Sequence, residues 1–467
     1  MSERPYWQEI WKLEGCKGPT WEVLDLISGK VRDSFDLPQR QTVLYRRANV
    51  RLQQLPPMLI KERKLEQPPS YIVATHGPAL VAAVMKDPSI LNEVGTYRVN
   101  CSHLGKEKDP EALAKYLKLV SKYCPVLIDL QWPKPRINEL SWGLDESIGI
   151  AMSVGKQMNI SFDTNNHLSP CTLDGDMPHL RVCFPEIANR LEVSDEIVFD
   201  DGKMVAKVLS KGTDGVAIIE CTEINTPDRT YSLKGKKWCC IRGKALGIKC
   251  ITLDDLESIA FAKETLWYEY VDTMMVSYFT CKQDILDFAN IAKKNSYTGK
   301  LWGKFETPGS LVDLKEILAL RDKYDQPILT EAMLGRGDLW IEIKKEAQGN
   351  WQKIQAKFFA IIQRENETRK SESLPLVTSI CATGFLESMM KKDGDMTNDE
   401  KADMRHAIAC WADRLMLSAE SSYGPQSVDC IRLEREVQNQ ARSDLWSGAL
   451  TLTWEPTETM TQLLHHD

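Results

Sequence analysis

The sequence lacks the patterns that mark secreted, membrane and disulfide-rich proteins. Its 13 cysteines include no Cys-x-x-Cys pair, and their number is odd, so reduced thiols are expected rather than a disulfide framework or a spaced zinc site. It has no run of about 18 apolar residues, which a membrane-spanning helix would need. The first residues, Met1 to Pro5, have no apolar signal core. These absences predict a cytoplasmic protein with no membrane partner.

The sequence also has no long block of lysine and arginine. The net charge is −7, and the richest basic stretch, Lys234 to Lys244, is interrupted by Trp238 and two cysteines. Nucleic-acid binding depends on clustered cations that displace counterions, so no nucleic-acid partner is expected. The 467 residues suggest two or three domains, or one barrel with an insertion.

Short apolar strands alternate with amphipathic helices along most of the chain. Three strands are expected at 71–74, 96–99 and 125–129, and five more at 274–278, 301–304, 328–333, 374–378 and 414–418. A long helix is expected over 342–367. Repeated β/α units form parallel sheets, and eight of them predict an α/β fold, the (β/α)₈ or TIM barrel. The active site of such a barrel lies at the carboxyl ends of its strands.

The β/α rhythm is interrupted once. Between 137 and 240 the strand-like runs 196–202, 204–209 and 215–221 follow one another with turns between them. We therefore expect an inserted lid domain, a small β-barrel, at 137–240, with the catalytic barrel formed by 69–136 and 241–442. Residues 1–68 are assigned to an N-terminal extension and 443–467 to a C-terminal tail.

Two segments with acidic residues occur at predicted strand ends. One is Gly303-Lys304-Phe305-Glu306, and the other runs from Gly335 to Leu339 and contains Asp338. Strands of a barrel end at the same face, so these side chains are expected to converge. A lysine beside two carboxylates can hold one divalent metal ion against an anionic substrate.

Several motifs in order resemble those of pyruvate kinase over roughly residues 70–440. They are Arg98 to His103, Lys304-Phe305-Glu306, Gly335 to Leu339, Ile380 to Met389, Leu417 to Ser421 and the triplet Asp200-Asp201-Gly202. The resemblance implies a phosphotransferase that moves a phosphoryl group between phosphoenolpyruvate, or a related enol acid, and ADP or ATP. Its partners would be a small 2-oxo or enol acid and a nucleoside di- or triphosphate.

The resemblance also implies roles for individual residues. Glu306 and Asp338 would ligate Mg²⁺ or Mn²⁺. The catalytic residues would be Lys304, Thr383 and Arg98, and the substrate would be bound by Gly337, Asp338 and Ser418. The nucleotide phosphates would be surrounded by Asn100, Ser102, His103, Asp129, Arg136 and Lys237.

The loop after the third strand predicts independence from potassium. Family members that require K⁺ carry Thr-Lys and a Glu there, whereas potassium-independent members carry Leu-Gln and a Lys. This sequence has Leu130, Gln131 and Lys134. The Lys134 ammonium would replace the monovalent cation, so the charge near the phosphates is retained and K⁺ is not required.

The sequence departs from the family pattern at several positions. Trp340 and Trp132 stand where the family has glycine, and Gly384 replaces a glutamine. After the helix at 428–441 too few residues remain for the family's C-terminal regulatory domain, so control by sugar phosphates is not expected and a homodimer stays open. Two other readings also stay open: a Mg²⁺-dependent 2-oxo-acid lyase or aldolase, and a non-catalytic ligand-binding paralogue. The lid domain and Lys134 would both act on the phosphates of a nucleotide, so they favour phosphoryl transfer over the lyase reaction.

Overall fold

The computed structural model describes residues 72–464, apart from 102–109, 131–134, 141–148, 163–176, 183–184, 213–214, 227, 236, 245–254, 256–269, 344, 448 and 451–457. The expected N-terminal extension lies outside the described residues. So do the site candidates Ser102, His103 and Lys134.

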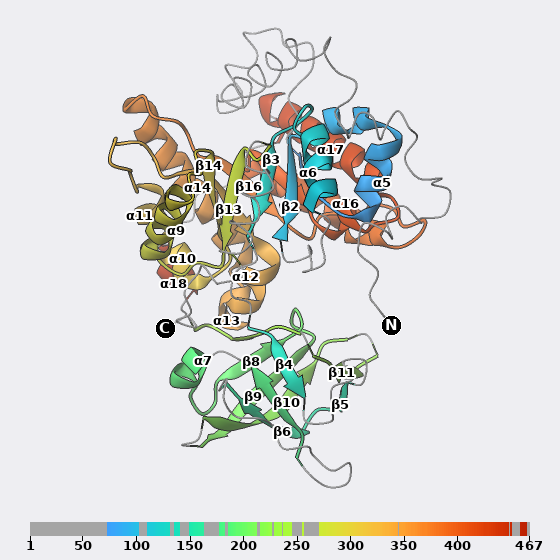
Figure 1. The fold of residues 1–467 in the computed structure, drawn as a ribbon, viewed down its shortest axis with the longest axis vertical. Coiled ribbons are helices and arrows are strands. Elements are labelled where there is room, and N and C mark those ends of the chain that lie inside the picture. Colours follow the sequence, from blue (N-terminus) through green and yellow to red (C-terminus); the bar gives the residue numbers. More distant parts are fainter. Residues whose placement is uncertain are drawn as a thin grey trace.

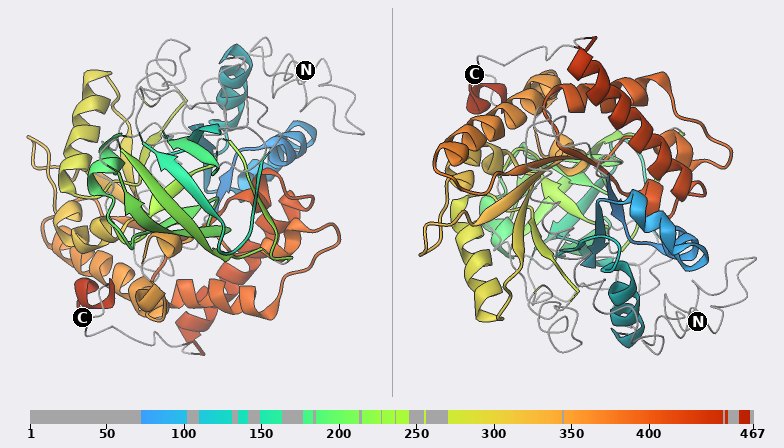
Figure 2. Two further views of the ribbon diagram at one scale, coloured as in Figure 1. Left: turned by 90° about the horizontal axis from the view of Figure 1, so that it is seen from below. Right: turned by 90° about the horizontal axis from the view of Figure 1, so that it is seen from above.

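Eight parallel strands close into a barrel in the order β1-β17-β16-β15-β14-β13-β3-β2, which confirms the predicted fold class. The helices surround these strands (Figure 2). The strands are β1 Ile72–Thr75, β2 Thr96–Asn100, β3 Val126–Asp129, β13 Thr273–Ser277, β14 Lys300–Phe305, β15 Leu329–Gly335, β16 Thr378–Ala382 and β17 Arg414–Leu417.

The barrel interior is filled by side chains that alternate with those facing the helices. In β1, Val73 belongs to the interior cluster, whereas its neighbours Ile72 and Ala74 join the larger core under the helices. The interior cluster consists of Val73, Leu127, Met275, Trp302, Met333, Ile380, Ala382 and Met416. Each large apolar side chain buried in this way contributes about 1.5–3 kcal/mol. The barrel is therefore a packed core whose polar chemistry is confined to its ends.

The helices around the barrel follow the predicted rhythm with local differences. Their bounds are α5 Pro78–Lys86, η1 Pro88–Glu93, α6 Pro110–Val120, α9 Lys282–Lys294, α10 Pro308–Val312, α11 Leu314–Leu318, α12 Arg336–Glu342, α13 Lys345–Gln348, α14 Trp351–Ser371, η4 Glu387–Met390, α15 Asn398–Ala409, α16 Ala419–Ser422, α17 Ser427–Ser447 and α18 Met460–Leu464. α15 begins at a capping box, in which Thr397 and Glu400 each bond the other's backbone N–H.

Two predicted elements of the barrel were wrong. The long helix expected over 342–367 is divided between α13 and α14, which Gly349-Asn350 separates, and α12 already ends at Glu342. The strand expected at 374–378 begins only at Thr378. Just before the strand, the Asn366 side chain takes the place of a neighbouring strand. It accepts from the Val377 N–H at 2.7 Å and donates to the Val377 carbonyl at 2.9 Å.

A second sheet is built from the chain between β3 and β13 and lies below the barrel in Figure 1. It has seven strands in the order β12-β8-β9-β10-β6-β7-β4, beside a two-stranded sheet of β11 and β5. The bounds are β4 Ile137–Leu140, β5 Ile150–Met152, β6 Gln157–Ser161, β7 His179–Val182, β8 Glu196–Phe199, β9 Met204–Lys211, β10 Val216–Ile224, β11 Tyr231–Leu233 and β12 Cys239–Ile241, with helix α7 at Pro185–Arg190.

This sheet is curled, because its two edge strands meet. The Ile137 N–H donates to the Lys237 carbonyl at 2.8 Å, and the Cys239 N–H donates to the Pro135 carbonyl at 2.8 Å. The sheet has a hydrophobic core of its own. We refer to it as the lid sheet; the boundaries 137 and 240 of the inserted domain stay a prediction.

The lid sheet contacts the barrel through helix α12. Val198, Val205, Trp238 and Cys240 of the lid sheet form one buried apolar cluster with Ile341 of α12. Nearby, the Gly243 N–H donates to the Glu342 carbonyl at 2.7 Å. Since α12 directly follows β15, the lid sheet is fixed beside the carboxyl ends of the barrel strands.

Among the described residues, no helix has both the length and the apolar composition that a membrane-spanning segment requires.

Candidate active site

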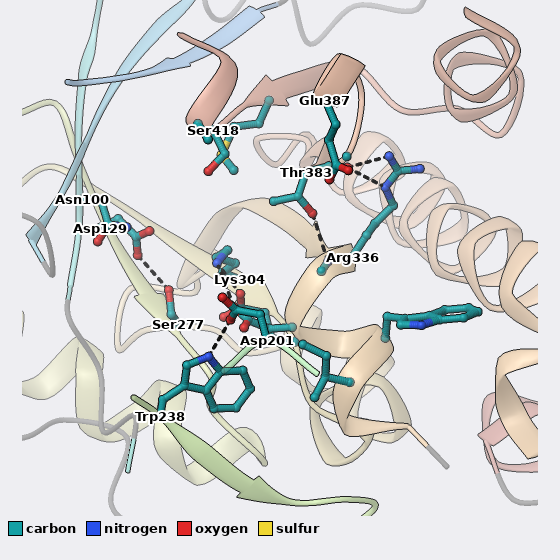
Figure 3. A pocket seen from close by; sticks show the side chains of 18 of the residues that line it. Asn100, Asp129, Asp201, Trp238, Ser277, Lys304, Arg336, Thr383, Glu387 and Ser418 are labelled. Atoms are coloured by element: carbon teal, nitrogen blue, oxygen red, sulfur yellow. Dashed lines mark hydrogen bonds and ion pairs between the residues drawn. The ribbon is translucent and has the colours of Figure 1, made fainter. Parts of the chain in front are cut away.

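A cavity of about 1210 Å³ lies between the carboxyl ends of the barrel strands and the lid sheet. Every described residue that the sequence predicted for the site lines it, and Figure 3 shows the cavity with many of these side chains. They are Arg98, Asn100, Asp129, Arg136, Lys237, Lys304, Glu306, Gly337, Asp338, Thr383 and Ser418. Residues up to 320 positions apart in the sequence are thus brought together, as the barrel topology requires.

The lysine and the two carboxylates converge. Lys304 lies in β14 and Glu306 directly after it, and the Lys304 ammonium contacts Glu306 Oε1. Asp338, in the first turn of α12, places Oδ2 3.9 Å from the same ammonium. Gly335 makes room for this arrangement, because a Cβ there would lie 2.5 Å from Glu306 Cγ. The ammonium thus contacts two carboxylates, one directly after β14 and the other in α12, which follows the neighbouring strand β15.

The donor set fits a hard divalent cation. In the described ranges there is no group of three or more His, Cys, Asp or Glu side chains arranged for a metal ion. Mg²⁺ needs no such group, since it is usually held by one or two carboxylates together with water and substrate oxygens. Glu306 and Asp338 supply such a pair.

Arg98, which also lines the cavity, is held by Asp129. Its Nε and Nη2 donate to Asp129 Oδ2 at 2.9 and 2.5 Å, and its Nη1 donates to Thr75 Oγ1 at 3.0 Å. The other oxygen of Asp129 accepts from Ser277 Oγ at 2.7 Å. Both charged side chains are almost fully buried. Asp129 therefore fixes the orientation of Arg98 toward the cavity.

The lid sheet contributes a strained turn to the cavity. Asp200, Asp201 and Gly202 all have positive φ, at 49, 56 and 86°. Asp200 accepts from Lys237 at 2.9 Å and from Lys203 at 3.1 Å. Burial raises the pKa of Asp200, but these two lysines outweigh it and hold that pKa below its ordinary value. The Lys237 ammonium thus lies against a carboxylate of its own sheet.

Thr383 follows β16 with a φ of 73°. Its Oγ1 accepts from the Gly337 N–H at 3.0 Å. The threonine that the sequence assigned to catalysis is therefore in direct contact with the backbone of Gly337, which was assigned to substrate binding.

Sequence reasoning did not assign several other lining residues to the site, among them Ser277, Trp238 and Glu420. Ser277 at the end of β13 binds Asp129, and its strand-end position was the signal that could have found it. Trp238 Nε1 donates to Asp201 at 2.5 Å, which no sequence pattern indicated. Glu420 accepts from the Ser418 N–H at 2.7 Å, and burial raises the pKa of its carboxyl.

Trp340, which replaces a family glycine, also lines the cavity. Its side chain is 42% exposed, and its ring packs edge to face on Trp351 with centroids 5.5 Å apart. Trp340 therefore contributes an aromatic surface to the cavity that Lys304, Glu306 and Asp338 also line.

The fold and this cavity define a class: (β/α)₈ barrels that carry an inserted β domain over the carboxyl ends of their strands. Within that class, the family model for "Pyruvate kinase, barrel domain" matches residues 68–431. The chain therefore belongs to the pyruvate kinase family.

Curated relatives agree with this assignment. The chain is 25% identical over 375 residues to a pyruvate kinase of Staphylococcus epidermidis, covering 80% of this chain and 57% of that protein. It is 26% identical over 394 residues to that of Methylorubrum extorquens, covering 83% and 72%, and 26% identical over 366 residues to that of Agrobacterium vitis, covering 78% and 67%. The match thus spans little more than half the length of the staphylococcal relative.

Proposed function

We propose that this protein is a Mg²⁺-dependent phosphotransferase of the pyruvate kinase type. It transfers a phosphoryl group from phosphoenolpyruvate, or a related enol acid, to a nucleoside diphosphate. With phosphoenolpyruvate, the P–O bond to the enol oxygen breaks, a P–O bond to ADP forms, and the enolate carbon gains one proton to give pyruvate. The observation that carries the proposal is the position of the Lys304 ammonium between Glu306 and Asp338 in a cavity that Arg98 also lines.

Each charged group has a task in this reaction. Glu306 and Asp338 would hold the metal ion, which supplies positive charge to substrate oxygens when bound. Lys304 stabilises negative charge on the enolate oxygen, because its ammonium is preorganised in a site shielded from water. Arg98, fixed by Asp129, binds the transferring phosphoryl group. Thr383 would lie near the carbon that is protonated after the phosphoryl group has been transferred.

We propose that the nucleotide binds in the same cavity, which is also lined by Asn100, Asp129, Arg136 and Lys237. The lid sheet would close over the nucleotide and exclude water. Lys134 would take the place of K⁺ near the phosphates, so that activity needs no monovalent cation.

Phosphorus NMR tests the proposal directly. The protein is incubated with phosphoenolpyruvate, ADP and MgCl₂ without K⁺, and the γ-phosphate resonance of ATP is followed. We expect ATP and pyruvate to appear together and to stop when EDTA removes the metal ion. Pyruvate production from a larger 2-oxo acid, with no nucleotide dependence, would instead establish lyase chemistry and contradict the proposal.

A further inference from the structure

Helix α12 holds Thr383 through a second residue, which lies in the Gly335 to Leu339 motif but to which the sequence assigned no role. We propose that Arg336 is a positioning residue, which fixes the backbone of Thr383 so that its hydroxyl faces the carbon to be protonated. The proposal rests on the proposed function, because it concerns the step in which Thr383 acts.

Arg336 contacts Thr383 through two hydrogen bonds. Arg336 Nε and Nη2 both donate to the Thr383 carbonyl, at 3.1 and 2.6 Å, as drawn in Figure 3. The next residue of α12, Gly337, donates its N–H to the Thr383 hydroxyl. The threonine is therefore held at its backbone by one residue of α12 and at its side chain by the next.

Arg336 is itself fixed on three sides. Its Nη1 donates to Asp403 of α15 at 2.8 Å and to Gln355 of α14 at 3.4 Å. Its guanidinium carbon lies 4.1 Å from the centroid of the Phe385 ring. Planar guanidinium groups suit such a combination of forked hydrogen bonds and stacking, which a lysine cannot reproduce. The carbonyl of Thr383 is thus tied to two helices through one buried cation.

Thr383 needs an external support of this kind. A φ of 73° is left-handed, and a β-branched residue adopts it only where the surroundings impose it. The following residue, Gly384, has a φ of 78°, so the peptide is flanked by two left-handed residues. A side chain at Gly384 would start 3.7 Å from Arg336 Nη2. That distance is an ordinary van der Waals contact, so glycine is favoured at this position by its left-handed backbone.

The step that depends on Thr383 can be measured apart from phosphoryl transfer. In deuterium oxide, a methyl C–H bond of pyruvate breaks to give the enolate, and a deuteron from solvent then forms the new C–D bond. Proton NMR follows this exchange with Mg²⁺ and ATP present. Calorimetric titration with oxalate and Mg²⁺ reports whether the metal and carboxylate site is intact.

The test compares Arg336→Lys with the wild type. We expect exchange to slow by about 100-fold, the loss typical when a reacting group is displaced by about 1 Å. Oxalate affinity should stay within about threefold of the wild type. In Arg336→Ala, added guanidinium ion should restore part of the exchange. Arg321→Lys is the matched control, since Arg321 pairs with Glu365 at 3.1 Å outside this cavity, and it should exchange at the wild-type rate.

Each other outcome overturns a distinct claim. Exchange within threefold of the wild type in Arg336→Lys, or a loss of oxalate affinity equal to the loss of exchange, would reject the positioning role. If Arg336→Lys fails to fold, Asp403→Asn replaces it, and unchanged exchange there would reject the role as well. A wild-type protein with neither exchange nor phosphoryl transfer would reject the proposed function itself.

Discussion

The pair of Arg98 and Asp129 gives the sharpest energetic prediction. The change is Asp129→Ala, which removes one charge from a pair whose side chains are only 4% and 3% exposed. It leaves the Arg98 guanidinium buried with its hydrogen bond to Thr75 Oγ1, and it also removes the acceptor of Ser277.

The magnitude follows from that burial. Leaving one member of a buried ion pair without its partner costs about 3–5 kcal/mol, because the remaining charge stays desolvated. A second change that removes the other charge, Arg98→Met with Asp129→Leu, should recover most of this loss, since apolar residues of similar volume often replace a buried pair at little cost. Both variants should be inactive, because the double variant lacks Arg98 and the single variant lacks the carboxylate that orients it.

Urea unfolding followed by circular dichroism measures the difference. The control is Lys203→Ala, which breaks the 3.1 Å ion pair with Asp200; that lysine is 47% exposed, so the loss should be below about 1 kcal/mol. The reasoning is refuted if Asp129→Ala costs no more than Lys203→Ala, or if the double variant is less stable than the single one.

Four further predictions concern single residues. Lys304→Met should abolish phosphoryl transfer while the fold persists, whereas Lys300→Met, at the start of the same strand, should keep activity; coupled assays of pyruvate formation compare them. Thr383→Gly should lose exchange yet stay within about 1 kcal/mol of wild-type stability, because relief of the left-handed strain offsets the lost hydrogen bond in urea unfolding. The pKa of Asp200 is lowered, so its stabilisation is present above pH 3.8 and lost as pH falls; the advantage of wild type over Asp200→Asn should shrink in acid, and a constant gap would contradict this. The pKa of Glu420 is raised, so Glu420→Gln should melt above wild type at pH 7 and equal to it below pH 4.5.

The sequence predicted the barrel because its signals are local. Each strand is a short apolar run followed by a polar strand-end residue, and the eight-fold repeat limits the topologies to one. Convergence of Lys304, Glu306 and Asp338 followed from that topology alone, because parallel strands of a barrel end at one face.

The misplaced elements had non-local causes. The strand at 374–378 was apolar enough to be a strand, but Asn366 of the preceding helix binds the backbone of Val377 and delays the strand to Thr378. The expected long helix breaks at Gly349-Asn350, although the helical periodicity continues across the break.

The supporting contacts of the site could not be read from spacing. The hydrogen bond from Arg336 to the Thr383 carbonyl joins residues 47 positions apart, and it depends on the left-handed backbone of Thr383. The hydrogen bond from Trp238 to Asp201 depends on the curl of the lid sheet. Such contacts are set by tertiary packing, so a sequence pattern reveals the residues but not their pairing.

Metal binding by the two carboxylates is the central claim, and Mn²⁺ titration followed by electron paramagnetic resonance tests it most directly. With oxalate present, the wild type should bind one Mn²⁺ tightly, and Glu306→Gln and Asp338→Asn should each weaken binding by at least about tenfold. Asp403→Asn, which removes another carboxylate of the same cavity, should bind as the wild type does. Undiminished Mn²⁺ affinity in both Glu306→Gln and Asp338→Asn would contradict the account.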